Sequence, residues 1–167
     1  MQRTAFTDMA CSLARTLDIA GEWWTPLILR DIWLGRRRFE EIQGNLEVSR
    51  KLLAERLETL VREGIVERRL YQERPPRHQY RLTKKGNELV AAVVLPLIAW
   101  GDRWTAGEAG PPLALRHKRC GRKMRPEVRC SECGEPLTGN EVRAEAGPGA
   151  RDDWGTRDVF TLPSIPG

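Results

Sequence analysis

The stretch from Phe39 to Gly86 constrains the fold of this chain more than any other part of the sequence. Its first half contains two helix patterns that are separated by a tight break. A short helix is expected over Phe39–Gln43, Gly44-Asn45 interrupts it, and Ser49 is a natural N-cap for the next helix. That second helix has an apolar stripe made by Leu53, Leu57, Leu60 and Val61. This order of elements predicts a helix-turn-helix.

The second half of the stretch has the pattern of a β-hairpin. Strands are expected over Ile65–Tyr71 and His78–Leu82, with Pro75-Pro76 at the tip of the turn that joins them. A hairpin directly after a helix-turn-helix is the arrangement called a wing. The expected fold class is therefore mainly α with a β-hairpin wing (α+β), a winged helix-turn-helix.

Helices are also expected on both sides of this unit. One covers Cys11–Ile19, and another is expected to begin with Thr25 as its N-cap and Pro26 in its first turn. Thr83 can cap a long final helix that reaches about Trp104, in which Pro96 should produce a kink.

The composition along the chain suggests four parts. We expect a winged helix-turn-helix domain for DNA binding and dimerisation over residues 9–106 and a Gly- and Pro-containing linker over 107–115. A compact zinc-ribbon-like module should follow over residues 116–143, and a flexible tail over 144–167.

Basic residues gather where a winged helix would meet DNA. A recognition helix needs a polar first turn that is free to reach base edges, and Ser49, Arg50 and Lys51 occupy that turn. Arg50 can offer a bidentate fork to guanine or phosphate, whereas Lys51 supplies a point charge. The other candidate DNA-binding residues, expected to contact the backbone, are Arg36, Arg37, Arg38, Arg74, Arg77 and His78. For any single one of these residues, a solvated surface charge is the alternative. The net charge of +5 alone favours nucleic acid only weakly.

Several short motifs resemble those of HxlR-type winged-helix regulators, which are related to the MarR group. They include Cys11-Ser-Leu-Ala-Arg-Thr-Leu, Gly21-Glu-Trp-Trp-Thr, Arg38-Phe-Glu-Glu-Ile, Ser49-Arg-Lys-Leu-Leu, Gly64-Ile-Val-Glu-Arg and Tyr80-Arg-Leu-Thr. The resemblance covers about Cys11–Trp104. It implies a bacterial homodimeric transcription factor that acts on a palindromic double-stranded DNA operator, often as a repressor.

Two positions depart from the family pattern. The family commonly has a hydroxyl residue at the position of Ala54 and an acidic residue at that of Gln79. Because Ala54 lies on the predicted recognition helix, base specificity can differ from that of relatives. Its methyl group could instead contact a thymine methyl.

The two outer helices carry more apolar surface than a small winged helix can bury alone. In the last helix these residues recur at three- and four-residue spacing: Leu89, Val93, Leu97, Trp100 and Trp104. For each residue, packing within the subunit is the alternative. For the set we expect a homodimer interface.

Four residues in the C-terminal part have the spacing of zinc ligands. His117-x-x-Cys120-Gly and Cys130-x-x-Cys133-Gly have the form of two zinc knuckles, and tetrahedral zinc needs four such ligands. A full protein ligand set leaves no open position for water, so the expected Zn²⁺ is structural, at about one ion per chain. Redox dithiol chemistry at Cys130 and Cys133 is the main alternative.

Cys11 stands apart from that group. It occupies the position of the N-terminal cysteine with which several HxlR-type members sense quinones, aldehydes or oxidants, and a cysteine in the first turn of a helix can be a reactive thiolate. A possible redox sensor is therefore one interpretation of Cys11. A buried, inert cysteine at the dimer interface is the other.

The sequence contains no enzyme motif. It has only two histidines, and no Gly-rich phosphate loop or His-Glu-x-x-His pattern. No apolar run approaches the ~20 residues of a membrane span, and no apolar signal core precedes Ala10. We therefore expect a cytoplasmic DNA-binding protein without enzyme activity or membrane contact. A small-molecule or oxidant effector is possible. The alternative is a winged-helix and zinc-ribbon module that binds protein and has no specific DNA target.

Overall fold

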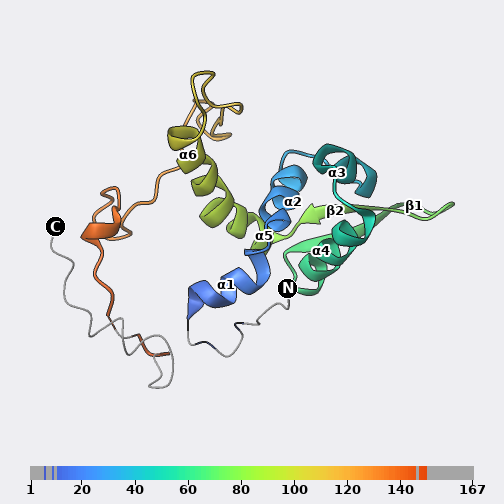
Figure 1. The fold of residues 1–167 in the computed structure, drawn as a ribbon, viewed down its shortest axis with the longest axis horizontal. Helices are drawn as coiled ribbons and strands as arrows, with labels where there is room; N and C mark the ends of the chain where they lie inside the picture. The colour runs from blue at the N-terminus through green and yellow to red at the C-terminus, as the bar shows by residue number, and fades with distance from the viewer. Residues whose placement is uncertain (1–5, 7–8, 10, 146, 150–167) are drawn as a thin grey trace. The chain divides into compact units, whose positions relative to one another are not determined.

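The structure is a computed structural model that describes Phe6, Met9 and residues 11–145 and 147–149 (Figure 1). The chain forms two compact units. One unit spans Trp24–Val128, and the other joins the described residues of Met1–Trp23 to those of Arg129–Gly167. The expected domain boundaries at 106 and 143 stay predictions. Most of the expected tail, residues 146 and 150–167, lies outside the described part of the chain.

The unit that includes the start of the chain contains the helix α1 over Ser12–Ala20, close to the expected range. Its last turn is closed by the N–H of Gly21, which donates to the carbonyl oxygen of Leu17 at 2.7 Å. Two of its apolar side chains, Leu13 and Leu17, are exposed.

In the unit Trp24–Val128, three helices form the helix-turn-helix part: α2 over Trp24–Trp33, α3 over Phe39–Leu46 and α4 over Arg50–Arg62. Helix α3 is longer than the predicted range of Phe39–Gln43. Gly44-Asn45 lies inside α3, and the chain leaves the helix at Glu47, which has a left-handed backbone with a φ of 53°. The expected N-cap of α4 is confirmed, because Ser49 Oγ accepts the N–H of Leu52 at 3.2 Å.

The core of this unit lies where the three helices and the first strand meet. The side chains that are almost fully buried there are Ile28, Leu29, Ile42, Leu53, Leu57, Leu60, Ile65 and Val66. The predicted apolar stripe of α4 therefore faces the core, which leaves the opposite face and the first turn of this helix in solvent.

The predicted hairpin is confirmed. Strand β1 covers Val66–Gln72, strand β2 covers Arg77–Leu82, and they pair in antiparallel register. The hairpin reaches out beyond α3 and α4 (Figure 1). Its base is tied to the start of α3 by the N–H of Tyr80, which donates to the carbonyl oxygen of Arg37 at 2.7 Å. This bond places the wing beside the helix-turn-helix.

The last long helix has three segments: α5 over Lys84–Leu89, a π-helical stretch over Val90–Val94, and α6 over Leu95–Trp104. The predicted cap is confirmed, because Thr83 Oγ1 accepts the N–H of Gly86 at 3.1 Å. Pro96 has no N–H to donate to the preceding turn. The wider π-helical turns lie directly before it, and such turns change the helix path without ending the helix.

Across the residues that the structure describes, no helix is both long and apolar enough to cross a membrane.

Candidate nucleic-acid interface

The first turn of α4 is exposed, as a recognition helix requires. Ser49, Arg50 and Lys51 all lie on the surface, while the hydroxyl of Ser49 is occupied by its capping bond. Lys51 extends into solvent with its Nζ 4.0 Å from Glu55 Oε1. Ala54 is also exposed, one turn further along the same helix. Base edges could therefore meet a short polar surface at this helix end.

The side chain of Arg50 is held by residues of α3. Its guanidinium carbon lies 4.9 Å from the centre of the Phe39 ring. Its Nη1 donates to Gln43 Oε1 at 3.4 Å. Neither Phe39 nor Gln43 was among the residues selected from the sequence.

A groove of about 580 Å³ lies between the start of α3, the start of α4 and the hairpin. It is lined mainly by cationic and aromatic side chains: Arg38, Phe39, Glu40, Glu41, Arg50, Arg68, Tyr71, Pro76, Arg77, His78 and Tyr80. The structure thus brings Arg38, Arg50, Arg77 and His78 to one surface. Arg74, also predicted, does not line the groove, although it lies near the hairpin tip.

Residues of the hairpin shape this groove. Arg68 Nη2 lies 3.0 Å from His78 Nδ1, and the Arg38 guanidinium carbon lies 4.9 Å from the centre of the Tyr71 ring. Burial raises the pKa of the Tyr80 hydroxyl. Arg68 stands opposite Tyr80 in the strand register, so the two share one face of the hairpin with His78. Alternation along the two strands could have identified Arg68 and Tyr80 from the sequence.

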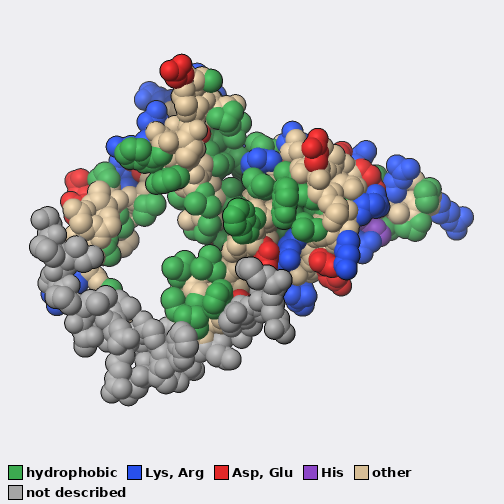
Figure 2. All heavy atoms as spheres, in the orientation of Figure 1, with side chains coloured by type: hydrophobic (Ala, Val, Ile, Leu, Met, Phe, Trp, Pro, Cys, Tyr) green, Lys and Arg blue, Asp and Glu red, His purple; other side chains and the backbone are tan. Residues whose placement is uncertain are grey.

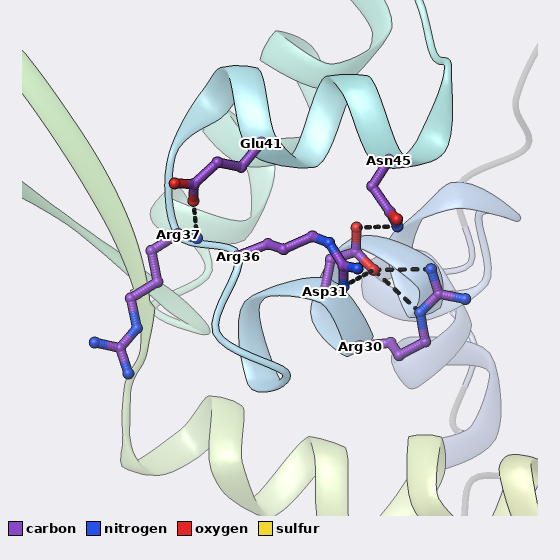
Figure 3. Close-up of polar contacts among 6 residues, drawn as sticks. All are labelled: Arg30, Asp31, Arg36, Arg37, Glu41 and Asn45. Atoms are coloured by element: carbon purple, nitrogen blue, oxygen red, sulfur yellow. Dashed lines mark hydrogen bonds and ion pairs between the residues drawn. The ribbon is translucent and has the colours of Figure 1, made fainter. Parts of the chain in front are cut away.

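The arginine run Arg36–Arg38 is anchored by two carboxylates, as Figure 3 shows. Asp31 of α2 has no exposed surface, and it accepts hydrogen bonds from Arg30 Nη2 at 2.8 Å and from Asn45 Nδ2 at 2.7 Å. The guanidinium of Arg36 also turns toward Asp31, with Nη1 3.8 Å from Oδ1. The Arg37 side chain points away from this cluster (Figure 3). Arg36 is thus engaged within the protein, and Arg37 extends into solvent.

The second carboxylate, Glu41, holds the backbone of the run. Its Oε2 accepts the N–H groups of Arg37 at 2.9 Å and Arg38 at 3.0 Å. The bond from the Arg38 N–H is the main reason that the pKa of Glu41 is lowered. The carboxylate therefore keeps the chain at the entry to α3 in place in its charged form.

Figure 2 shows that Lys and Arg side chains gather on the hairpin and on the helices beside it. Acidic side chains are interspersed there, Glu40 and Glu41 among those at the groove. The electrostatic surface is therefore basic but mixed, which suits contact with phosphates at specific points.

Each cysteine motif of the C-terminal part forms a knuckle. In the first, the N–H of Gly121 donates to the carbonyl oxygen of His117 at 2.8 Å, and Gly121 has a φ of 69°. Cys120 Sγ lies 3.4 Å from His117 Nδ1. The turn therefore points its two predicted ligands toward the same place.

The second knuckle repeats this backbone geometry. The N–H of Gly134 donates to the carbonyl oxygen of Cys130 at 3.0 Å, and Gly134 has a φ of 77°. The backbone N–H groups of Cys133 and Glu132 hydrogen-bond to the sulfur of Cys130 and lower the pKa of its thiol. In the described residues, no group of three or more His, Cys, Asp or Glu side chains is close enough to hold a metal ion.

Cys11 is the residue before α1 and is half-buried as a free thiol. No described side chain caps the helix at this position.

Comparisons with known proteins agree with this fold. The profile of the HxlR-like helix-turn-helix family matches residues 19–109. Rv3095 of Mycobacterium tuberculosis, an uncharacterised HTH-type transcriptional regulator, is 44% identical over 138 residues, which are 83% of this chain and 87% of that protein.

Two solved structures are similar as well. PA1607, a candidate transcription factor, has a TM-score of 0.74 at 30% identity, with 86% of this chain and all of that chain covered. The redox regulator HypR in its reduced form has a TM-score of 0.52 at 30% identity, with 56% of this chain and 92% of that chain covered. The fold, its exposed recognition helix and these relatives lead to one assignment: the chain belongs to the HxlR-like helix-turn-helix family of DNA-binding transcriptional regulators.

Proposed function

We propose that the protein is a cytoplasmic repressor that binds a palindromic operator as a homodimer. The observation that carries this proposal is the exposed first turn of α4 beside a groove lined with arginines. In this arrangement Arg50 contacts a base edge in the major groove. Lys51, Arg37, Arg38 and Arg77 contact phosphates. The family is one of transcriptional regulators rather than of enzymes.

The proposed dimer interface is supported by exposed apolar side chains on α6. Leu97, Trp100 and Trp104 are 54%, 61% and 65% exposed, and this helix has no fully buried residue. An apolar surface of this kind on a regulator is expected to be covered by a partner. A second copy of the chain would bring two recognition helices to the two half-sites of a palindrome.

Salt dependence tests whether DNA is bound through phosphates. Affinity for a duplex recovered from a random pool should fall about 10³- to 10⁵-fold between 50 and 200 mM salt, if the dimer neutralises about 6–10 phosphates. Fluorescence anisotropy over a salt series measures this slope. An affinity that does not change with salt would favour the alternative function, a protein-interaction module.

An oxidant or a thiol-reactive compound is the proposed effector class. The similarity to the redox regulator HypR and the half-buried thiol of Cys11 support this part of the proposal. Alkylation of Cys11 should lower operator affinity. Unchanged affinity after complete alkylation would exclude Cys11 as the sensor.

We further propose that His117, Cys120, Cys130 and Cys133 bind structural zinc. The proposal is supported by the knuckle geometry that each pair has by itself, with a glycine of positive φ after the second ligand. Because so small a module buries little apolar surface, metal would supply most of its stability.

The zinc prediction is tested by elemental analysis of the purified full-length chain. We expect about one zinc ion per chain in the wild type and in the control variant Cys11→Ser. Cys120→Ser and Cys133→Ser should each lose most of the metal. A metal-free wild type with Cys130 and Cys133 joined by a disulfide would establish the redox alternative instead.

A further inference from the structure

The three residues at the start of α4 differ in how their side chains are held. The hydroxyl of Ser49 is bound by its own helix end, and Lys51 is 89% exposed in its side chain. Arg50 is different because its guanidinium contacts two side chains of another helix, α3. It is the one residue of this turn that combines a planar donor group with a fixed position.

The two α3 residues approach Arg50 in complementary ways. Phe39 and Gln43 are four residues apart and so lie on the same face of α3. The ring of Phe39 lies under the guanidinium plane at 4.9 Å, a distance at which the cation is attracted to the aromatic face. Gln43 accepts one guanidinium N–H at 3.4 Å.

Gln43 is itself held in place. Its Nε2 donates to the carbonyl oxygen of Val48, a buried residue of the turn between the two helices, at 3.4 Å. This bond leaves Oε1 of the amide directed at Arg50. The chain of contacts therefore runs from the turn through Gln43 to the arginine.

This arrangement leaves most donors of Arg50 available. A guanidinium has five N–H donors, and Gln43 uses one of them. A bidentate contact to guanine needs two donors in one plane. Immobilising a long side chain on binding costs conformational entropy, and a side chain that is already held does not incur most of that cost.

We propose that Phe39 and Gln43 are positioning residues that hold the Arg50 guanidinium ready for its base contact. This inference rests on the proposed operator-binding function. Sequence discrimination by the protein then depends on two residues of α3 that act through Arg50.

A second stacked arginine in the same groove provides a matched comparison. The guanidinium of Arg38 lies over Tyr71 at the same distance of 4.9 Å, but its Nε is also 3.7 Å from the carboxylate of Glu41. Arg38 precedes α3 and does not lie on the recognition helix. Its expected contact is a phosphate, which carries no base information.

The test measures discrimination rather than affinity alone. The probes are a duplex recovered by selection from a random pool and copies of it with single base-pair substitutions. The position contacted by Arg50 is the one at which Arg50→Lys loses discrimination, because lysine lacks the planar fork. Phe39→Leu and Gln43→Met should each lower discrimination at that position about 3- to 10-fold. Affinity for a random-sequence duplex should change less than about twofold.

Double variants separate positioning from a general structural effect. In an Arg50→Lys background, Phe39→Leu should cause no further loss of discrimination, because the group that it positions is gone. The control Tyr71→Leu should weaken binding to the selected and substituted duplexes by the same factor. Urea unfolding of each variant verifies that it is folded.

Three results would overturn the proposal. In the first, Phe39→Leu and Gln43→Met lower the binding affinity for all duplexes by the same factor. In the second, they raise discrimination between base pairs. In the third, they lower discrimination as much in the Arg50→Lys background as in the wild type. A wild-type protein that binds the selected and random duplexes equally would contradict the proposed function as well. In the first three cases operator binding stands, and only the positioning role is lost.

Discussion

Replacing Asp31 with alanine is expected to lower the free energy of unfolding by about 2–4 kcal/mol. The Asp31 side chain is fully buried and bonds to Arg30 and Asn45, with Arg36 nearby. Removing the carboxylate leaves these donors facing an apolar space. Arg30 and Arg36 are partly exposed, at 31% and 41%, and can turn toward water. The loss should therefore be smaller than for a pair that is buried on both sides.

Urea unfolding followed by circular dichroism measures this loss. Glu58→Ala is the matched control, because Glu58 is an exposed acid on α4 and its loss should change stability by less than about 0.5 kcal/mol. Asp31→Asn keeps one acceptor oxygen and should fall between the two. Asp31 contacts Arg36, which precedes α3, and Asn45, which lies near the end of α3. If Asp31→Ala were as stable as the control, these contacts would not stabilise the packing of α2 against α3.

Replacing Arg50 with alanine should reduce discrimination at one base pair of each half-site about 5- to 150-fold, which corresponds to about 1–3 kcal/mol. Arg50 is exposed at the first position of α4, and its guanidinium lines the groove. A bidentate contact to a base edge would be lost completely in this variant.

Lys51→Ala is the control for the Arg50 variant. Lys51 is a flexible point charge next to Arg50, so its loss should weaken binding to all sequences by a similar factor and lower the salt slope by about one. Binding titrations with a panel of substituted duplexes distinguish the two patterns. Uniform weakening by both variants would mean that Arg50 contacts only phosphate.

Local patterns in the sequence were sufficient for two helix caps and for the wing. The predicted cap at Thr25 was wrong, because α2 already begins at Trp24 and Thr25 is buried within it. Ser49 and Thr83 cap their helices as expected, because a cap depends on a hydroxyl and an N–H two or three residues away. The strands follow from alternation and from the turn residues between them. Recognition of a winged helix needed only the order of these short-range features.

Features that depend on tertiary contacts could not be predicted in this way. The helix α3 continues through Gly44-Asn45 although both residues favour breaks, and there the amide of Asn45 bonds to the buried Asp31 of α2. The groove combines Arg38 and Phe39 with Tyr71, which is far from them in the sequence. Arg36 and Arg37 are identical residue types side by side in the sequence. Only the tertiary structure shows that Arg36 faces the buried Asp31 whereas Arg37 points away from it.

Selection of bound DNA from a random pool tests the central claim most directly, that two copies of the chain place two α4 helices in one operator. The account predicts an enriched palindromic motif whose half-sites are about one helical turn, roughly 10 base pairs, apart. Arg50→Lys should change the base preference at one position of each half-site. A pool without an enriched motif, or a motif without two-fold symmetry, would contradict the account.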